Sequence, residues 1–118
     1  MTLLFKPEHV EPILRDEKTQ TRRAWKKCRV KVGNIQKAKL KLFSKDYFAL
    51  LKIVGVRQEK LGNISEIDAK AEGGYTPETY RQKWTEINGD WNPDQVVYVV
   101  DFQLYKPAQL ASQRRGEV

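Results

Sequence analysis

The 118-residue chain carries 22 Lys and Arg residues against 15 Asp and Glu, and its formal charge of +7 is unevenly spread. A chain of this length forms one domain and needs no metal or disulfide to build a core, and its single cysteine excludes an internal disulfide. No apolar run is long enough to span a membrane, and no signal-peptide pattern is present, so a cytoplasmic protein without a membrane partner is expected. Ten basic residues and no acidic residue lie between Lys18 and Lys41, which favours a polyanionic partner such as RNA or a nucleotide.

The N-terminal third is predicted to hold one strand, one helix and a long basic loop. Residues 3–5 form a short apolar run that is typical of a strand. Apolar residues then recur at helical spacing and predict a helix over residues 8–16. Residues 18–31 show no regular period, so we expect a loop there. His9 is expected to be solvated on the surface of the helix, and Cys28 to have no chemical role.

Two strands are predicted in the middle of the chain, over residues 37–43 and 48–57. In the first, lysines alternate with apolar residues, so that Lys37, Lys39 and Lys41 share one face at intervals of about 7 Å. Such a face is either a solvated strand edge, where lysines discourage edge-to-edge pairing, or a track for phosphates. The residues alone leave both interpretations open.

The C-terminal half is predicted to hold two helices and a final strand. Ser65 is a helix N-cap, and Gly73 ends that short helix. Pro77 begins a second helix at the position where proline is best tolerated. Residues 95–105 form the clearest strand, with apolar residues on both faces over its first half. In total, about five strands and three short helices are predicted, and they do not alternate regularly. This pattern predicts an α+β fold built on a small curved sheet or barrel.

The segment that opens the basic stretch, Lys18-Thr-Gln-Thr21-Arg22-Arg23, mixes basic side chains with hydroxyls. This mixture suits contacts with phosphates and carboxylates. An amine beside a hydroxyl is also the minimal arrangement of an activated nucleophile, although a lysine acts as a base only if burial lowers its pKa. An ordinary basic loop is the alternative. Trp25, among basic residues, either stacks on a base or plugs one end of the barrel.

Four segments in order carry a family resemblance: residues 16–23, Lys31-Val-Gly-Asn-Ile35, Leu61-Gly-Asn-Ile-Ser65, and the closing strand over residues 96–102. Together they resemble an ASCH domain, a small branch of the PUA-like fold, over about residues 3–105. The family usually reads Gly-x-Lys-Thr-x-Thr at the first segment. This chain departs from the family in two places: Asp16-Glu17 replaces the glycine, and a basic loop that contains Trp25 follows Arg23.

The resemblance implies a small PUA-like mixed β-barrel of about five strands with two or three short helices. It places an ASCH domain at residues 1–105 and a polar, flexible tail at residues 106–118. It also implies an RNA- or nucleotide-binding protein with a basic cleft and no cofactor or metal. The residues expected to contact the nucleic acid are Lys18, Arg22, Arg23, Trp25, Lys26, Lys37, Lys39 and Lys41.

Some small bacterial ASCH proteins are amidohydrolases that remove the acetyl group from acetylcytidine, so this activity is the alternative function. The catalytic residues of these enzymes are a lysine, a threonine and a glutamate. Lys18 and Thr21 match the first two, and Glu72 lies where the family has its glutamate. In that case Thr21 attacks the acyl carbonyl and Lys18 moves the proton. A plain Lys18–Glu72 ion pair at the rim of a cleft is the other interpretation, and the sequence leaves open whether the protein is an enzyme. A protein-interaction adaptor is a third, less favoured class.

Overall fold

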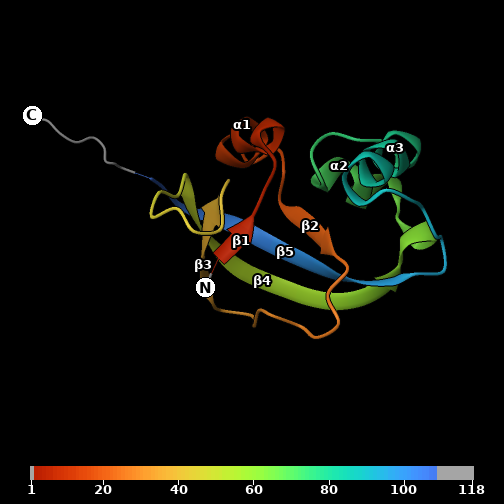
Figure 1. The fold of residues 1–118 in the computed structure, drawn as a ribbon, viewed down its shortest axis with the longest axis horizontal. Helices are drawn as coiled ribbons and strands as arrows, with labels where there is room; N and C mark the ends of the chain where they lie inside the picture. Colours follow the sequence, from red (N-terminus) through yellow and green to blue (C-terminus); the bar gives the residue numbers. More distant parts are fainter. Residues whose placement is uncertain (1, 109–118) are drawn as a thin grey trace, which may run out of the picture.

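The structure, a computed structural model, describes residues 2–108. Five strands, three α-helices and two short 3-10 helices follow one another along the chain (Figure 1). Their order is β1 (Thr2–Leu4), η1 (Pro7–His9), α1 (Val10–Leu14), β2 (Gln20–Arg23), β3 (Ile35–Lys39), β4 (Ala49–Lys60), η2 (Leu61–Asn63), α2 (Glu66–Ala71), α3 (Pro77–Asn88) and β5 (Val96–Pro107). Within these residues, no helix has both the length and the apolar character needed to cross a membrane.

All five strands belong to one mixed sheet in the order β1-β3-β4-β5-β2. β1 runs parallel to β3, and every other neighbouring pair is antiparallel. The long strands β4 and β5 curve along their length and form the middle of the sheet (Figure 1). The α+β prediction is confirmed, but the sheet is open between β1 and β2 rather than closed into a barrel. One hydrogen bond spans the opening, from Arg23 Nη2 to the carbonyl oxygen of Leu4 at 2.7 Å.

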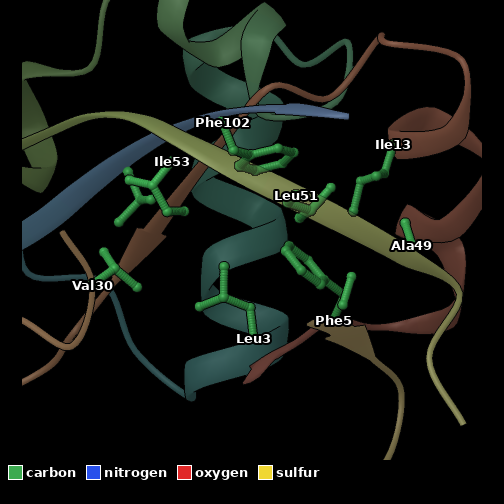
Figure 2. Packing of buried hydrophobic residues seen from close by; sticks show 10 residues of the cluster. Leu3, Phe5, Ile13, Val30, Ala49, Leu51, Ile53 and Phe102 are labelled. Carbon is green, nitrogen blue, oxygen red and sulfur yellow. The ribbon is translucent and has the colours of Figure 1, made fainter. Parts of the chain in front are cut away.

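Apolar residues are buried on both faces of the sheet. Figure 2 shows the first cluster, which joins the β1–α1 region to β3, β4 and β5, and in which Phe5 lies edge-on to Phe102. The second cluster packs α2 and α3 against Val97 and Val99 of β5. Because β5 contributes Val100 and Phe102 to the first cluster, this strand is buried on both sides, as its sequence predicts.

The two C-terminal helices begin where their capping residues predict. Ser65 Oγ accepts a hydrogen bond from the amide of Asp68 at 3.0 Å and starts α2. Thr76 and Thr79 form a reciprocal capping box at the start of α3, with Pro77 in the first turn. Both caps satisfy amides that the helix itself leaves without partners. α2 is therefore fixed at its N-terminus, which places Glu72 at its C-terminal end.

Several boundaries differ from the predictions. β2 lies inside residues 18–31, which were expected to be a loop. β3 ends at Lys39 rather than at residue 43, and the predicted helix over residues 8–16 is a 3-10 turn followed by a helix that ends at Leu14. β5 continues through Pro107, two residues beyond the expected end of the domain at 105. The rest of the predicted tail, residues 109–118, lies outside the described residues.

Candidate functional site

A cleft of about 400 Å³ lies at the opening between the two edge strands. Its walls come from the end of β1 and η1, from β2, and from α3 with the segment that precedes it. The ionisable residues on its walls are Lys6, His9, Lys18, Arg22, Arg23, Glu72, Tyr75, Tyr80 and Lys83. Thr21, Phe5 and Trp84 also line it. The cleft therefore joins three segments that are distant in the sequence.

Lys18 is held at the cleft by the turn between α1 and β2. Its backbone amide donates to the carbonyl of Pro12 at 3.0 Å, and the next amide, that of Thr19, donates to Ala71 at the end of α2. The side chain is 2% exposed, and its Nζ donates to the carbonyls of Gln20 and Glu72 at 2.9 and 2.7 Å. A third bond, of 3.2 Å, reaches Glu72 Oε1. The ammonium thus caps the C-terminus of α2, where a positive charge is favourable.

Burial shifts both members of this ion pair toward their neutral forms. Desolvation lowers the pKa of Lys18 below its ordinary value, and the facing Glu72 carboxylate opposes the shift. Desolvation likewise raises the pKa of Glu72, against the charges of Lys18, Arg22 and Arg23. The buried ammonium and carboxylate can therefore exchange protons at a smaller cost than exposed groups would.

Thr21 and Arg23 lie on the same face of β2, because their positions differ by two in a strand. The Arg23 Nε donates to Thr21 Oγ1 at 3.0 Å, and the guanidinium lies 4.9 Å from the centre of the Phe5 ring. Together with its bond to Leu4, these contacts fix Arg23 across the opening of the sheet. The Thr21 hydroxyl therefore faces the cleft with an arginine as its immediate neighbour.

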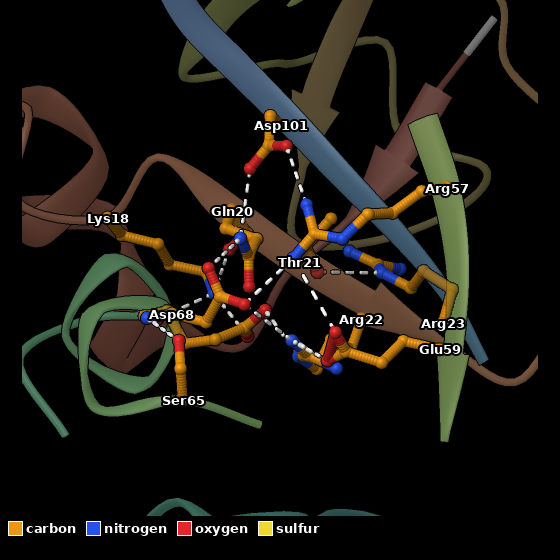
Figure 3. A network of polar contacts seen from close by, with 11 residues as sticks. Lys18, Gln20, Thr21, Arg22, Arg23, Arg57, Glu59, Ser65, Asp68 and Asp101 are labelled. Carbon is orange, nitrogen blue, oxygen red and sulfur yellow. Dashed lines mark hydrogen bonds and ion pairs between the residues drawn. The ribbon is translucent and has the colours of Figure 1, made fainter. Parts of the chain in front are cut away.

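Arg22 lies on the opposite face of β2, in the network of ion pairs drawn in Figure 3. Its Nη2 contacts Glu59 at 2.8 Å and Asp68 at 3.2 Å. Asp68 also contacts Arg57 at 2.8 Å and accepts a hydrogen bond from Gln20 at 3.2 Å. These contacts tie β2 to β4 and to α2, so the cleft wall is held by charges rather than by apolar packing.

Four buried polar atoms among the cleft-lining residues have no hydrogen-bond partner in the described part of the chain. They are Arg22 Nε, Arg22 Nη1, Glu72 Oε2 and Trp84 Nε1. A buried polar atom without a partner costs about 1–3 kcal/mol, so such atoms need a reason to exist. Three donors and one acceptor along the lining of one cleft match a ligand that has both carbonyl-type acceptors and an N–H donor.

His9 and Tyr75 form a pair at the cleft that the sequence did not reveal. His9 is 8% exposed rather than solvated, so the prediction for it was wrong. Its Nε2 lies 3.0 Å from the Tyr75 hydroxyl, and burial lowers the pKa of the imidazole to about 4. Burial raises the pKa of Tyr80 well above its usual range, and the negative charge of Glu72 is the second largest cause of this increase. The only sequence signal for this wall was the helical spacing of Tyr80 and Trp84, which indicated core packing.

Comparison with known proteins finds matches in structure but not in sequence. No protein-family model and no curated protein matches the chain. The ASCH domain of Lactobacillus crispatus superimposes with a TM-score of 0.61 at 18% identity, covering 80% of this chain and 69% of that one. The ASCH protein of Zymomonas mobilis gives 0.62 at 12% identity, covering 90% and 68%. An Enterococcus faecalis protein of the family model DUF984 gives 0.67 at 14% identity, covering 94% and 77%.

This chain has the ASCH-domain fold. The resemblance expected from the sequence is therefore confirmed at the level of the fold. One of the two departures from the ASCH pattern has a structural explanation, because Asp16 adopts a left-handed backbone with φ of 59°. Aspartate tolerates this conformation, which glycine adopts readily, better than most residues do.

The ASCH cleft gathers only part of the predicted site. Lys18, Thr21, Arg22, Arg23 and Glu72 all line it. The remaining predicted residues, Trp25, Lys26, Lys37, Lys39 and Lys41, do not line it.

The outlying residues have other surroundings. Trp25 packs against the first core cluster beside Tyr98, with ring centres 6.1 Å apart. Lys26 is exposed. Lys39 Nζ donates to the carbonyl of Ser44 at 2.6 Å, and Lys41 lies beyond the end of β3. The prediction that Lys37, Lys39 and Lys41 share one strand face is therefore wrong, because Lys41 lies outside β3.

Among residues 2–108, no cluster of three or more histidine, cysteine, aspartate or glutamate side chains is arranged to hold a metal ion.

Proposed function

We propose that the cleft binds a nucleobase, either of a free nucleotide or of an unpaired residue in RNA. The observation that carries this proposal is the set of buried polar atoms of Arg22, Glu72 and Trp84 that have no hydrogen-bond partner within residues 2–108, two of which, Arg22 Nε and Glu72 Oε2, lie 4.0 Å apart as an ion pair. A base presents carbonyl-type acceptors and N–H donors at its edge, and the arginine and carboxylate provide their complements. Tyr75 and Trp84 add aromatic surface, which contributes to base binding by stacking.

The size and charge of the cleft support the same ligand. A volume of about 400 Å³ lies within the range of small-molecule sites, which favours a single nucleoside unit. Lys6 is exposed at the cleft, and no carboxylate pairs with it within residues 2–108. It is the group we assign to the phosphate, because the other lysines of the cleft, Lys18 and Lys83, are already paired with acids.

Binding is tested by titrating the protein with each of the four ribonucleoside monophosphates and measuring the affinity by calorimetry or ligand-observed NMR. Trp84→Phe removes one donor and keeps an aromatic ring, and Glu72→Gln removes the carboxylate charge but keeps one carbonyl acceptor. Circular dichroism checks that Glu72→Gln is folded, because loss of its ion pair with Lys18 also destabilises the protein. Both variants should weaken binding about tenfold, the cost of one lost hydrogen bond in a buried site. Ile67→Ala, an exposed position on α2 away from the cleft, is the control and should leave binding unchanged. Wild-type protein that binds neither the four nucleotides nor single-stranded oligoribonucleotides of the same bases refutes the proposal.

A second candidate, amide hydrolysis, is favoured by one specific observation: Lys18, Thr21 and Glu72 all line the same cleft. Burial lowers the pKa of Lys18, which reduces the cost of forming the neutral amine that this step needs, and the amine then accepts the Thr21 proton as the hydroxyl oxygen bonds to the acyl carbon. The ammonium then returns the proton to the leaving nitrogen as the C–N bond breaks. Water cleaves the resulting ester and releases the acid. The bond from Arg23 to Thr21 places a positive charge beside the developing oxyanion.

Hydrolysis is tested by measuring acetate release from acetylcytidine. Thr21→Ala and Lys18→Ala should abolish release while Ile67→Ala retains it. Wild-type activity that persists in Thr21→Ala excludes the covalent role of the threonine. A wild-type protein that binds nucleotides and releases no acetate leaves the binding function standing and removes the hydrolase.

A further inference from the structure

A second hollow lies next to the cleft, in the loop between β3 and β4. It has a volume of about 320 Å³ and is lined by Leu40, Lys41, Ser44, Asp46, Tyr47 and Phe48. Leu40 lines both this hollow and the cleft, so the two cavities share one wall. In Figure 1 the loop is the yellow segment that joins β3 to β4. We call it the loop hollow.

The loop that forms this hollow also exposes large apolar side chains that are not among its lining residues. Phe43 is 95% exposed and Leu42 is 56% exposed, although both would gain from burial. The loop is nevertheless held in place, because Lys39 Nζ bonds to the Ser44 carbonyl and the Phe48 amide bonds to the Ala38 carbonyl at 2.9 Å. A held loop that presents large apolar side chains to water is typical of a surface that binds another molecule.

The charges around the loop hollow are mainly positive. Lys37, Lys41 and Lys45 are exposed, and none of them forms an ion pair in the described part of the chain. Lys37 Nζ lies 5.5 Å from the centre of the Tyr47 ring. Asp46 supplies the single carboxylate among the lining residues. Ammonium groups interleaved with accessible aromatic rings are the arrangement that single-stranded nucleic acids bind, with bases on the rings and phosphates on the lysines.

We propose that the loop hollow binds the nucleotide adjacent to the one in the cleft, so that the ligand is a single-stranded RNA segment rather than a free nucleotide. This inference rests on the proposed function of the cleft and specifies its ligand. Leu40 lines both cavities, and this is the reason to prefer RNA over a lipid surface or an acidic peptide. When one base of an RNA strand fills the cleft, the strand must either continue past Leu40 or leave the protein. Phe43 then stacks on the second base.

The test compares mononucleotides with the matching homopolymeric hexanucleotides, measured by calorimetry at a low and at a physiological salt concentration. The wild-type protein should bind its preferred hexanucleotide at least tenfold more tightly than the mononucleotide. Phe43→Ala should weaken hexanucleotide binding about tenfold and leave mononucleotide binding unchanged, because one stacked base is lost. Replacing Lys41 and Lys45 with alanine should reduce the salt dependence of hexanucleotide binding. The matched control is Ile67→Ala, which removes an apolar side chain that is 81% exposed and lines neither cavity.

Four results would overturn the inference. Equal affinity of the wild-type protein for mononucleotide and hexanucleotide leaves the cleft proposal intact and removes the second subsite. An equal loss for both ligands in Phe43→Ala shows that this residue acts on the cleft itself. Binding to phosphatidylserine vesicles that depends on Phe43 and exceeds hexanucleotide binding identifies a membrane surface instead. A protein that binds neither ligand fails at the cleft, and the second subsite falls with it.

Discussion

The buried pair of Lys18 and Glu72 is the feature whose perturbation has the largest expected effect. Their side chains are 2% and 3% exposed, and the Nζ–Oε1 distance is 3.2 Å. Removing one partner leaves the other charge buried, which typically costs about 3–5 kcal/mol. We expect Lys18→Met and Glu72→Gln each to lower the free energy of unfolding by this amount. The double variant should lose less than the sum of the two, because it leaves no uncompensated charge.

The two single variants should also respond to pH in opposite directions. In Lys18→Met, the pKa of Glu72 rises further above its ordinary value of 4.5, because less positive charge opposes the effect of burial. The folded state then binds more protons than the unfolded chain, so stability falls as the pH rises from 4.5 through the raised pKa. In Glu72→Gln, the pKa of Lys18 falls further below 10.5. The unfolded chain then binds more protons, so stability rises as the pH increases toward 10.5.

Urea denaturation followed by circular dichroism, repeated across a series of pH values, measures both effects. The double variant should show a flatter pH profile than either single variant, since both titrating groups are gone. It should still be less stable than the wild type, because methionine leaves the carbonyls of Gln20 and Glu72 without their donor. Parallel pH profiles in the two single variants, or losses below about 1 kcal/mol, would show that the pair is solvated and the reasoning is wrong.

Three smaller effects follow from individual residues. His9, the single histidine of the chain, should titrate by NMR with a midpoint of about 4, and a midpoint close to its ordinary value of 6.5 would show that the ring is solvated. Asp16→Ala should destabilise the protein by about 1 kcal/mol, because alanine is strained at φ of 59°, whereas Asp16→Gly should be nearly neutral; equal losses would place the cost elsewhere. Thr76→Ala should cost about 1 kcal/mol through the lost helix cap, and an unchanged denaturation midpoint would mean that the capping bonds contribute nothing.

The parts of the fold that could be predicted from sequence are those with local physical causes. Ser65 and Pro77 mark helix starts by capping chemistry, which acts within a few residues. The apolar alternation around Val97 and Val99 predicts a strand buried on both faces, because the pattern directly reflects burial. The ASCH resemblance then provided the order in which these elements are connected.

β2 could not be predicted because its residues are polar. Gln20, Thr21 and Arg22 are all buried, yet their sequence shows no apolar period, since ion pairs and strand pairing with β5 replace apolar packing. The opposite error occurred at Leu40 and Leu42, apolar residues that continue the alternation of β3 but are 46% and 56% exposed. The spacing of apolar residues predicts a strand only when that strand is buried by apolar contacts. The prediction therefore fails where the buried side chains are polar and where the apolar side chains face water.

The candidate site was predicted as a list of charges, and the fold separates these charges into two groups. Arg22 and Lys18 are neutralised by Glu59, Asp68 and Glu72 within the structure, so they hold the cleft wall together. The exposed lysines around the loop hollow keep their charge available to a ligand. Counterions are released from a nucleic acid when basic side chains that have no acidic partner neutralise its phosphates. The salt dependence of RNA binding should therefore come mainly from the loop. A mononucleotide confined to the cleft should show a much smaller dependence, which distinguishes the two regions even though the sequence presents them as one basic stretch.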